Sequence, residues 1–265
     1  MMKISVDEYK PKKAVLSIED VNLYLLNSIR RIMLSELPKL AIEDVVIYDN
    51  TTTLFDEIIS HRLGLIPLPT DPDLLNFRDE CNCGGKGCPT CTVRYTLSKE
   101  GEGAVYSGDL QPSEASWRIG EDLIPIVELF NDQRLILEVE AVLGRAKDHA
   151  KWQVVTAPGY HLYPHISFDP KHKDDVEDFV ETLPDGLVSV KKDNSIELSD
   201  IAKLPLFESY VDKENADFIS IKRDQHHVQF HFETDGSYTA DKALLKSIDL
   251  FQEKLNAFSE MIDEL

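Results

Sequence analysis

The most regular pattern of apolar positions along the chain lies at its C-terminal end. Large apolar residues recur there at alternating spacings of four and three, at Leu244, Ile248, Phe251, Leu255, Phe258, Ile262 and Leu265. This spacing predicts a helix with a coiled-coil-like a/d seam, and Thr239 is placed to cap its start. A helix over residues 240–265 is about 39 Å long, which is more than a small domain covers by itself. Part of the seam must therefore pack against either the chain's own first helix or another subunit, and the spacing leaves both open.

A second amphipathic helix is predicted over residues 20–37. Asp20 is a candidate N-cap, and Pro38 is expected to stop the helix. One apolar stripe follows the helical period, at Leu26, Ile29, Met33 and Leu37. Arg30 and Arg31 lie beside this stripe, so the first helix combines an apolar face with two guanidinium groups.

Between these two helices, β-branched and alternating segments predict strands. The segments are residues 14–18, 41–48, 92–97, 124–129, 134–142, 218–222 and 228–233. A short helix is expected over residues 56–63, with His61 and Arg62 near its negative end and Gly64 as its C-cap. Helical fragments near residues 174–182 and a hairpin at Asp193-Asn194 complete an α+β pattern.

All four cysteines lie within eleven residues, in the pattern C-x-C-x4-C-x2-C: Cys81, Cys83, Cys88 and Cys91. Four thiolates on short arms can converge on one zinc ion, and the glycine-rich turn at residues 84–87 lets the backbone fold back far enough. Four protein ligands leave no open position on the metal, so the pattern favours a structural rather than a catalytic zinc. An iron-sulfur cluster, or free or disulfide-bonded cysteines, remain the alternatives.

The net charge of the chain limits which partners we expect it to bind. The chain has 48 acidic and 28 basic residues, a formal charge of −20, which argues against direct contact with nucleic acid. No apolar run approaches the length of a membrane span and the start lacks the features of a signal peptide, so we expect a cytoplasmic protein without membrane contact.

Catalytic motifs are not apparent. The turn at residues 144–152 lacks the glycines of a dinucleotide site and the Gly-Lys-Ser/Thr of a P-loop. His227 and His231 share one face of a predicted strand, which suggests a solvated face rather than metal ligands. His161 and His165 have helical ligand spacing, but Pro164 between them argues against a helix, so we assign them no chemical role. No Gly-x-Ser-x-Gly elbow or Asp-rich polymerase motif is found, so we expect a protein that is not an enzyme by itself.

Residues 27–68 closely resemble the signature of the archaeal RNA polymerase D subunit family, the counterpart of the eukaryotic third subunit and of bacterial alpha. The resemblance rests on Asn27, Arg30, Arg31, Glu36, Pro38, Ala41, Ile42, Val45, Asp56, Glu57, His61, Arg62, Gly64 and residues 65–67. Three later stretches agree with the family pattern, at residues 106–110, 149–152 and 235–237. The resemblance therefore extends over nearly the whole chain.

This resemblance implies an alpha-like dimerisation domain made from residues 1–43 and 162–265, interrupted by a mostly-β insert domain at residues 44–161 that carries the cysteines. In the family, the first and last helices pair with subunit L, and the large B subunit and the small N and P subunits assemble on this heterodimer. The expected partner-binding residues are Leu26, Ile29, Arg30, Arg31, Met33, His61, Arg62, Leu244, Ile248, Phe251, Leu255, Phe258 and Ile262. Arg30, Arg31 and the His61-Arg62 turn would face the large subunits, where arginine forks onto carboxylates or carbonyls.

One departure from the family concerns a ferredoxin-like module, expected here at residues 168–216. Many members have a Cys-x2-Cys-x2-Cys-x3-Cys-Pro run there, but this chain has Lys173, Val176, Phe179 and Leu183 before Pro184. Such a module would hold no cluster and depend on packing alone. The alternatives to a polymerase scaffold are a stand-alone zinc-binding enzyme or regulator and, less in keeping with this cysteine-free segment, a ferredoxin-type electron carrier.

Overall fold

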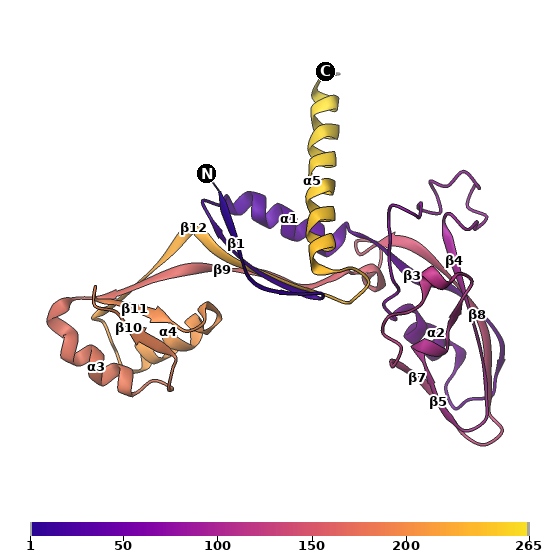
Figure 1. Cartoon of the computed structure of the whole chain (residues 1–265), viewed down its shortest axis with the longest axis horizontal. Helices are drawn as coiled ribbons and strands as arrows, with labels where there is room; N and C mark the ends of the chain where they lie inside the picture. Colours follow the sequence, from indigo (N-terminus) through magenta and orange to yellow (C-terminus); the bar gives the residue numbers. More distant parts are fainter. Residues whose placement is uncertain (1, 264–265) are drawn as a thin grey trace. The chain divides into compact units, whose positions relative to one another are not determined.

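The computed structural model describes residues 2–263, so Leu265, the last position of the predicted seam, lies outside the described residues. The chain is a mixed α/β protein that consists mostly of strands (Figure 1). The strands are β1 (Lys3–Lys10), β2 (Lys13–Glu19), β3 (Pro38–Asn50), β4 (Thr92–Glu100), β5 (Gly103–Tyr106), β6 (Gln111–Pro112), β7 (Pro125–Leu129), β8 (Arg134–Arg145), β9 (Val155–Phe168), β10 (Val188–Val190), β11 (Ser195–Leu198) and β12 (Ile219–Thr234). The α-helices are α1 (Leu23–Ser35), α2 (Asp56–Gly64), α3 (Lys173–Glu181), α4 (Leu204–Lys213) and α5 (Ala240–Asp263).

The described strands form three sheets. The largest has the order β1-β2-β12-β9-β11-β10, the second has the order β3-β8-β4-β6, and the third pairs β5 with β7. The chain divides into two compact units. The first unit contains residues 2–8, Val15–Asn27 and Gly159–His231, and the second contains Tyr9–Ala14, Ser28–Pro158 and residues 232–263.

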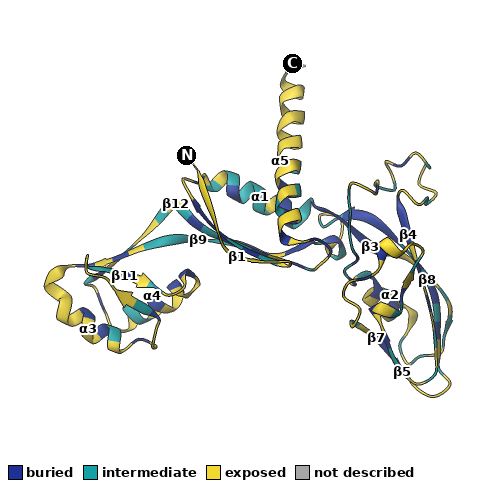
Figure 2. Ribbon diagram, in the orientation of Figure 1, coloured by how far each residue is buried: buried dark blue, intermediate teal, exposed yellow. Residues whose placement is uncertain are grey.

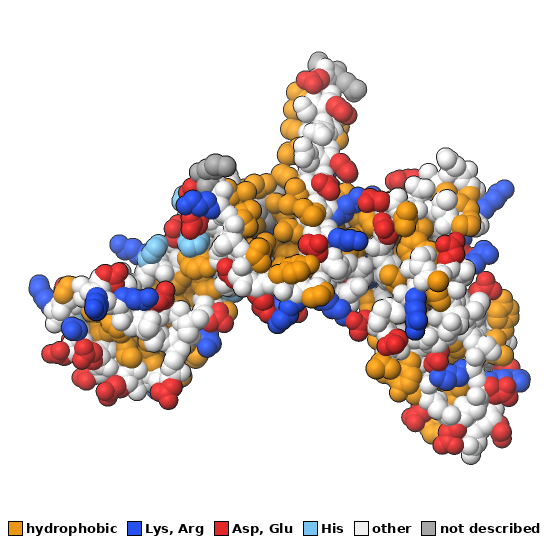
Figure 3. Space-filling model, in the orientation of Figure 1, with side chains coloured by type: hydrophobic (Ala, Val, Ile, Leu, Met, Phe, Trp, Pro, Cys, Tyr) orange, Lys and Arg blue, Asp and Glu red, His pale blue; other side chains and the backbone are white. Residues whose placement is uncertain are grey.

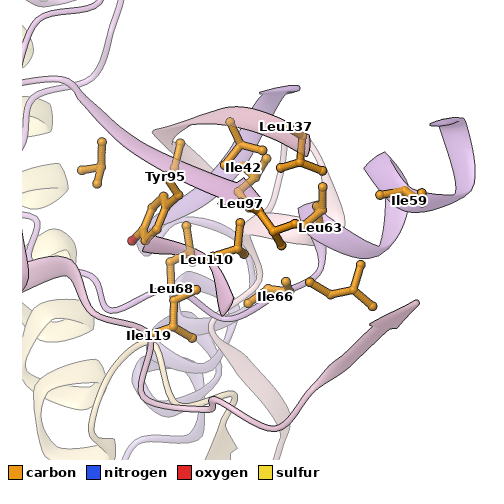
Figure 4. Close-up of a cluster of buried hydrophobic side chains, with 14 of the residues drawn as sticks. Ile42, Ile59, Leu63, Ile66, Leu68, Tyr95, Leu97, Leu110, Ile119 and Leu137 are labelled. Carbon is orange, nitrogen blue, oxygen red and sulfur yellow. The ribbon is translucent and has the colours of Figure 1, made fainter. Parts of the chain in front are cut away.

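The core of the second unit lies on the inner face of the β3-β8-β4 sheet. Strands β3 and β8 pair antiparallel from Pro38 opposite Arg145 to Asn50 opposite Leu135, with two register shifts. Inward-facing residues of these strands pack with α2 and the loops that follow it (Figure 4). The Tyr95 hydroxyl at the centre of this core donates to the Trp117 carbonyl oxygen at 2.9 Å, which satisfies its polar end.

The core of the first unit lies around α3 and α4. It contains Ile166, Phe168, Val176, Phe179, Leu183, Leu187, Ile196, Leu204, Phe207, Ala216 and Ile219. Val176, Phe179 and Leu183, three of the four positions where the family resemblance led us to expect cysteines, are thus buried apolar residues of this core. Packing of apolar side chains stabilises this segment.

Several element boundaries differ from the sequence-based predictions. Helix α1 begins at Leu23, and the Asn22 side chain accepts from the Tyr24 amide at 2.9 Å, so Asn22 caps the helix instead of Asp20. Asp20 has φ 55°, a left-handed conformation that an N-cap does not adopt. The helix ends at Ser35, and β3 already begins at Pro38.

Two further predictions were wrong. Gly64 is the last residue of α2 and the right-handed Leu65 is its C-cap, so no left-handed glycine ends this helix. The two strands expected at residues 218–222 and 228–233 are one strand, β12, which continues because it has β2 and β9 as hydrogen-bonding neighbours. Strands β1, β5 and β9 and helix α4 were not predicted from the sequence pattern.

Candidate metal-binding and partner-binding sites

The four cysteine sulfurs converge on one point. All four Sγ atoms lie within 4.8 Å of one another. Individual Sγ–Sγ distances are 3.5 Å for Cys81 and Cys88, 3.7 Å for Cys83 and Cys91, and 3.8 Å for Cys88 and Cys91. Four sulfurs about 2.3 Å from a tetrahedral zinc are about 3.8 Å apart. The arrangement is therefore compatible with a single metal ion held by four thiolates.

Local backbone geometry produces this convergence. Gly84, Gly85 and Gly87 have φ values of 63°, 80° and 79°, a left-handed conformation that glycine adopts without steric cost. Arg78 fastens the turn, because its Nε donates to the Gly85 carbonyl oxygen at 3.2 Å. The same guanidinium binds Asp44 of β3 and Glu140 of β8, each at 3.0 Å. The cysteine loop is thus tied to the insert sheet independently of a metal.

The thiols differ in acidity. Desolvation opposes ionisation of Cys83, but hydrogen bonds from the Cys81 and Cys91 side chains and the Gly87 amide outweigh it and lower the pKa of Cys83 to about 6. Burial raises the pKa of Cys91 to about 11, against a hydrogen bond from the Cys88 amide. Metal binding requires thiolates, and the hydrogen bonds within the cluster favour the thiolate of Cys83 whereas burial opposes that of Cys91.

Helix α5 has two different faces. Its buried residues are small, Ala240, Ala243 and Ser247. Its large apolar residues form what we call the α5 ridge, Leu244, Ile248, Phe251, Leu255, Phe258 and Ile262. Leu244 and Phe251 are half-buried, whereas the other four are 39–61% exposed. Figure 2 shows α5 exposed along most of its length, and Figure 3 shows apolar side chains along it.

The residues predicted on α1 are placed differently. Leu26 and Met33 are 4% and 1% exposed, so they belong to the interior of the chain itself. Ile29 is half-buried, and Arg31 is exposed. The Nε of Arg30 donates to the Pro158 carbonyl oxygen at 2.9 Å, which holds this side chain against its own chain. Of the α1 residues predicted to bind a partner, Ile29 and Arg31 are the more accessible.

The His61-Arg62 turn lies at the surface on α2. Both residues are exposed. Arg62 Nη1 donates to the Ile126 carbonyl oxygen of β7 at 2.6 Å, so part of its guanidinium fastens α2 to that strand. His61 and the remaining edge of Arg62 are accessible to another molecule.

Residues 144–152, considered above as a phosphate loop, are held by internal contacts. The Lys151 ammonium donates to the Ile42 carbonyl oxygen at 2.9 Å and pairs with Glu43. Gly144 lies under the Trp152 ring, where an added Cβ would come within 2.2 Å of the ring carbon Cε2. The glycine and the lysine of this motif therefore serve packing and hydrogen bonding.

The histidines form stacked pairs in the first unit. His161 lies against His231 with ring centroids 5.2 Å apart, and Tyr163 lies against His227 at 3.7 Å. Within residues 2–263, the four cysteines are the one group of three or more His, Cys, Asp or Glu ligand atoms close enough to share a metal ion. No helix in this described part of the chain is both long and apolar enough to cross a membrane.

Sequence reasoning missed one buried charge. Lys39, the second residue of β3, is 4% exposed and pairs with Asp235. Its position inside an apolar run, Pro38-Lys39-Leu40-Ala41-Ile42, was the available signal, because lysine is almost never fully buried without a partner.

Comparison with known proteins identifies the class first and then the family. The model of the RNA polymerase Rpb3/RpoA insert domain matches residues 45–160. Along the whole chain, the DNA-directed RNA polymerase subunit Rpo3 of Thermoplasma volcanium is 36% identical, covering 99% of this chain and 100% of the relative. The same subunit of Methanosarcina acetivorans is 37% identical and covers 100% of this chain and 99% of the relative. That of Picrophilus torridus is 34% identical and covers 98% of this chain and 100% of the relative.

The chain therefore belongs to the archaeal family of DNA-directed RNA polymerase subunit Rpo3, the D subunit. The resemblance found in the sequence is confirmed. As a polymerase subunit, the chain has other polymerase subunits as its partners.

Proposed function

We propose that this chain is a non-catalytic assembly subunit that pairs with subunit L in an alpha-like heterodimer, on which the large B subunit and the small N and P subunits assemble for DNA-templated transcription. The observation that carries the proposal is the α5 ridge. Four of its residues, Ile248, Leu255, Phe258 and Ile262, are 39–61% exposed on a helix whose small residues face its own chain. A regular apolar seam left in water is typical of a surface that another helix covers.

Burial of this ridge favours association energetically. Each large side chain that moves from half-exposed to buried contributes on the order of 1 kcal/mol. Ile29 of α1 extends the same kind of surface, and Arg31 adds a guanidinium that can fork onto a carboxylate or carbonyl oxygen. Leu26 and Met33 are buried beneath this surface and hold α1 in place by packing. His61 and Arg62 on α2 form a separate surface, which we assign to the large subunit.

The proposed domains follow from this pairing. Residues 1–43 and 162–265 form the dimerisation domain, and residues 44–161 form the insert domain, in keeping with the family match over residues 45–160. Residues 168–216 form a ferredoxin-like module without a cluster. The apolar core at Val176, Phe179 and Leu183 supports this assignment, because it leaves no ligands where a cluster would be bound.

We propose one structural zinc ion at Cys81, Cys83, Cys88 and Cys91. The sulfur distances match a tetrahedral ion with four protein ligands, and such an ion would cross-link the glycine turn. An iron-sulfur cluster is the alternative, and elemental analysis with a visible spectrum separates the two. The place of action we propose is the cytoplasm.

The test is co-purification. A tagged copy of the full chain, expressed with and without subunit L, is isolated and its mass is measured under native conditions. We expect a one-to-one complex with L, and association or precipitation of the chain when L is absent, because the α5 ridge is then exposed. A stable monomer that does not bind L would contradict the proposal.

A further inference from the structure

Lys39 is the buried lysine at the start of β3. Its side chain is 5% exposed, and its ammonium donates to the Lys151 and Gln153 carbonyl oxygens at 2.9 and 3.2 Å. It also lies 2.5 Å from the Asp235 Oδ2. An ammonium has three hydrogens to donate, so these three acceptors satisfy it completely. Lys39 thus joins two turns of the second unit that are far apart in sequence.

Asp235 and its neighbours lead directly into α5. The second carboxylate oxygen of Asp235 accepts from the Ser237 amide at 3.0 Å and from the Ser237 hydroxyl at 2.6 Å. The Tyr238 hydroxyl donates to the Pro38 carbonyl oxygen at 2.7 Å. Adjacent residues of β3 therefore hold the turn before α5 at two points.

The first turns of α5 are the only part of the helix that contains buried residues within the described chain. The Ala240 amide donates to the Pro11 carbonyl oxygen at 2.8 Å, and the Tyr9 hydroxyl donates to Asp241 at 3.0 Å. Beyond Ser247 no described residue of α5 is buried. A helix of this length is about 36 Å long, so a tilt of about 10° at its base moves its far end by about 6 Å. The direction of the α5 ridge depends mainly on the contacts at its base, since the ion pair of Lys254 with Glu36 further along the helix is exposed.

We propose that Lys39 is a positioning residue for partner binding, because its ammonium holds the turn at residues 235–237 against the turn at residues 151–153 and thereby sets the direction of α5. The inference rests on the proposed pairing through the α5 ridge. Without the ammonium, the Asp235 carboxylate and two carbonyl oxygens lose their donor in a mostly buried place. The turn then loses its ionic link to residues 151–153, while the bonds from the Asp235 amide to the Val154 carbonyl oxygen and from the Tyr238 hydroxyl to the Pro38 carbonyl oxygen remain. The first turns of α5 are therefore held less firmly.

The test uses Lys39→Met, which keeps an unbranched side chain that is shorter by one atom and removes its charge. In the full-length chain without L, diluted until it does not associate, amide hydrogen exchange over residues 235–247 should become about tenfold faster, while strands β4 and β8 stay protected. The dissociation constant for subunit L should rise about tenfold or more. Lys254→Met is the matched control, because Lys254 on α5 forms an exposed ion pair with Glu36 at 3.2 Å and should change neither measurement.

Two more variants keep the test decisive. Asp235→Asn removes the same ion pair from the other side, and serves if Lys39→Met does not fold. The double variant Lys39→Met/Asp235→Asn should recover part of the lost protection, because it buries no unpaired charge.

Unchanged exchange at residues 235–247, or faster exchange with unchanged affinity for L, would overturn the role of Lys39. Failure of the unaltered chain to bind L would instead refute the proposed function. In that case the exchange measurement still decides whether Lys39 positions α5.

Discussion

At the scale of single residues, Trp152 shows how a motif that suggests ligand chemistry can serve packing. The indole Nε1 donates to the Val142 carbonyl oxygen at 3.3 Å, and the ring occupies the space above Gly144. The neighbouring Lys151 ammonium lies 4.5 Å from the ring centroid. The contacts of Lys151 are thus supplied by the Trp152 ring and the Ile42 carbonyl oxygen, so its presence near Gly144 does not indicate phosphate binding.

The cysteine site gives the first residue-scale prediction. Cys88→Ser should release the metal, because it replaces one of four thiolates with a poor zinc ligand. Residues near 76–92 should then exchange amide hydrogens faster, while the Arg78 contacts to Asp44 and Glu140 keep the loop attached to the sheet. Metal content by elemental analysis and hydrogen exchange by mass spectrometry check both effects.

Asn82→Ser is the matched control for this variant, because Asn82 is an exposed residue between Cys81 and Cys83 that supplies no thiol. It should retain a full complement of metal. If Cys88→Ser also keeps its metal, the proposed ligand set is wrong. Pairing with subunit L should be the same in both variants, since the α5 ridge does not include this loop.

At the scale of elements, the two faces of α5 differ: one packs against its own chain and the other is largely exposed. Ala240, Ala243 and Ser247 let the helix approach its own chain closely. Of the larger residues, Leu244 and Phe251 are half-buried, and Ile248, Leu255, Phe258 and Ile262 are exposed. Two ion pairs, of Lys246 with Asp73 and of Lys254 with Glu36, each at 3.2 Å, also join the helix to its own chain. Each pair has one largely solvated partner, so it contributes little stability.

The substitution Leu255→Asp tests whether the α5 ridge binds subunit L. Leu255 is 51% exposed, so the free chain should lose no more than about 0.5 kcal/mol of stability. Subunit L should bind about a hundredfold more weakly or not at all, because pairing would bury an unpaired carboxylate. Thermal unfolding of the free chain and calorimetric titration with L measure the two quantities.

Asn256→Asp provides the control, because it adds the same charge to the neighbouring residue, which lies outside the α5 ridge. It should bind L normally. Equal loss of binding in both variants would mean that charge on α5 matters and the apolar seam does not.

At the scale of the whole molecule, the two units have separate cores. Phe179 of the first unit packs edge-on against Phe207 and Phe218, with centroids 6.0 and 6.4 Å apart. The core of the second unit, around Tyr95 and Leu137, contains none of these residues. Local destabilisation of the first unit should therefore leave the second unit folded.

Phe179→Ala makes that prediction specific. Removing a buried ring should cost the first unit about 3–5 kcal/mol, with no change in affinity for subunit L. Urea unfolding followed by hydrogen exchange of α3 and α5 separates the two effects. Leu206→Ala, at a residue of α4 that is 45% exposed, is the control and should change little. Loss of L binding together with α3 protection would show that the two units are coupled.

Much of this architecture could be predicted from local patterns. The heptad spacing of α5, the alternation of β8 and the glycine-rich cysteine turn each depend on residues close together in the chain, and the structure has these elements where they were expected. The family resemblance extended that reasoning across the chain. Periodicity shows which residues share a face, because helices and strands have fixed repeats.

Tertiary structure decided what covers each face. Leu26 and Met33 of α1 have the same spacing as the exposed α5 ridge, yet they are buried. The continuity of β12 depends on neighbouring strands, and the burial of Lys39 depends on carbonyl oxygens and a carboxylate more than 110 positions away in sequence. Burial and ion pairing are set by contacts between distant segments, so a local pattern names the candidate residues and only the folded chain determines their partners.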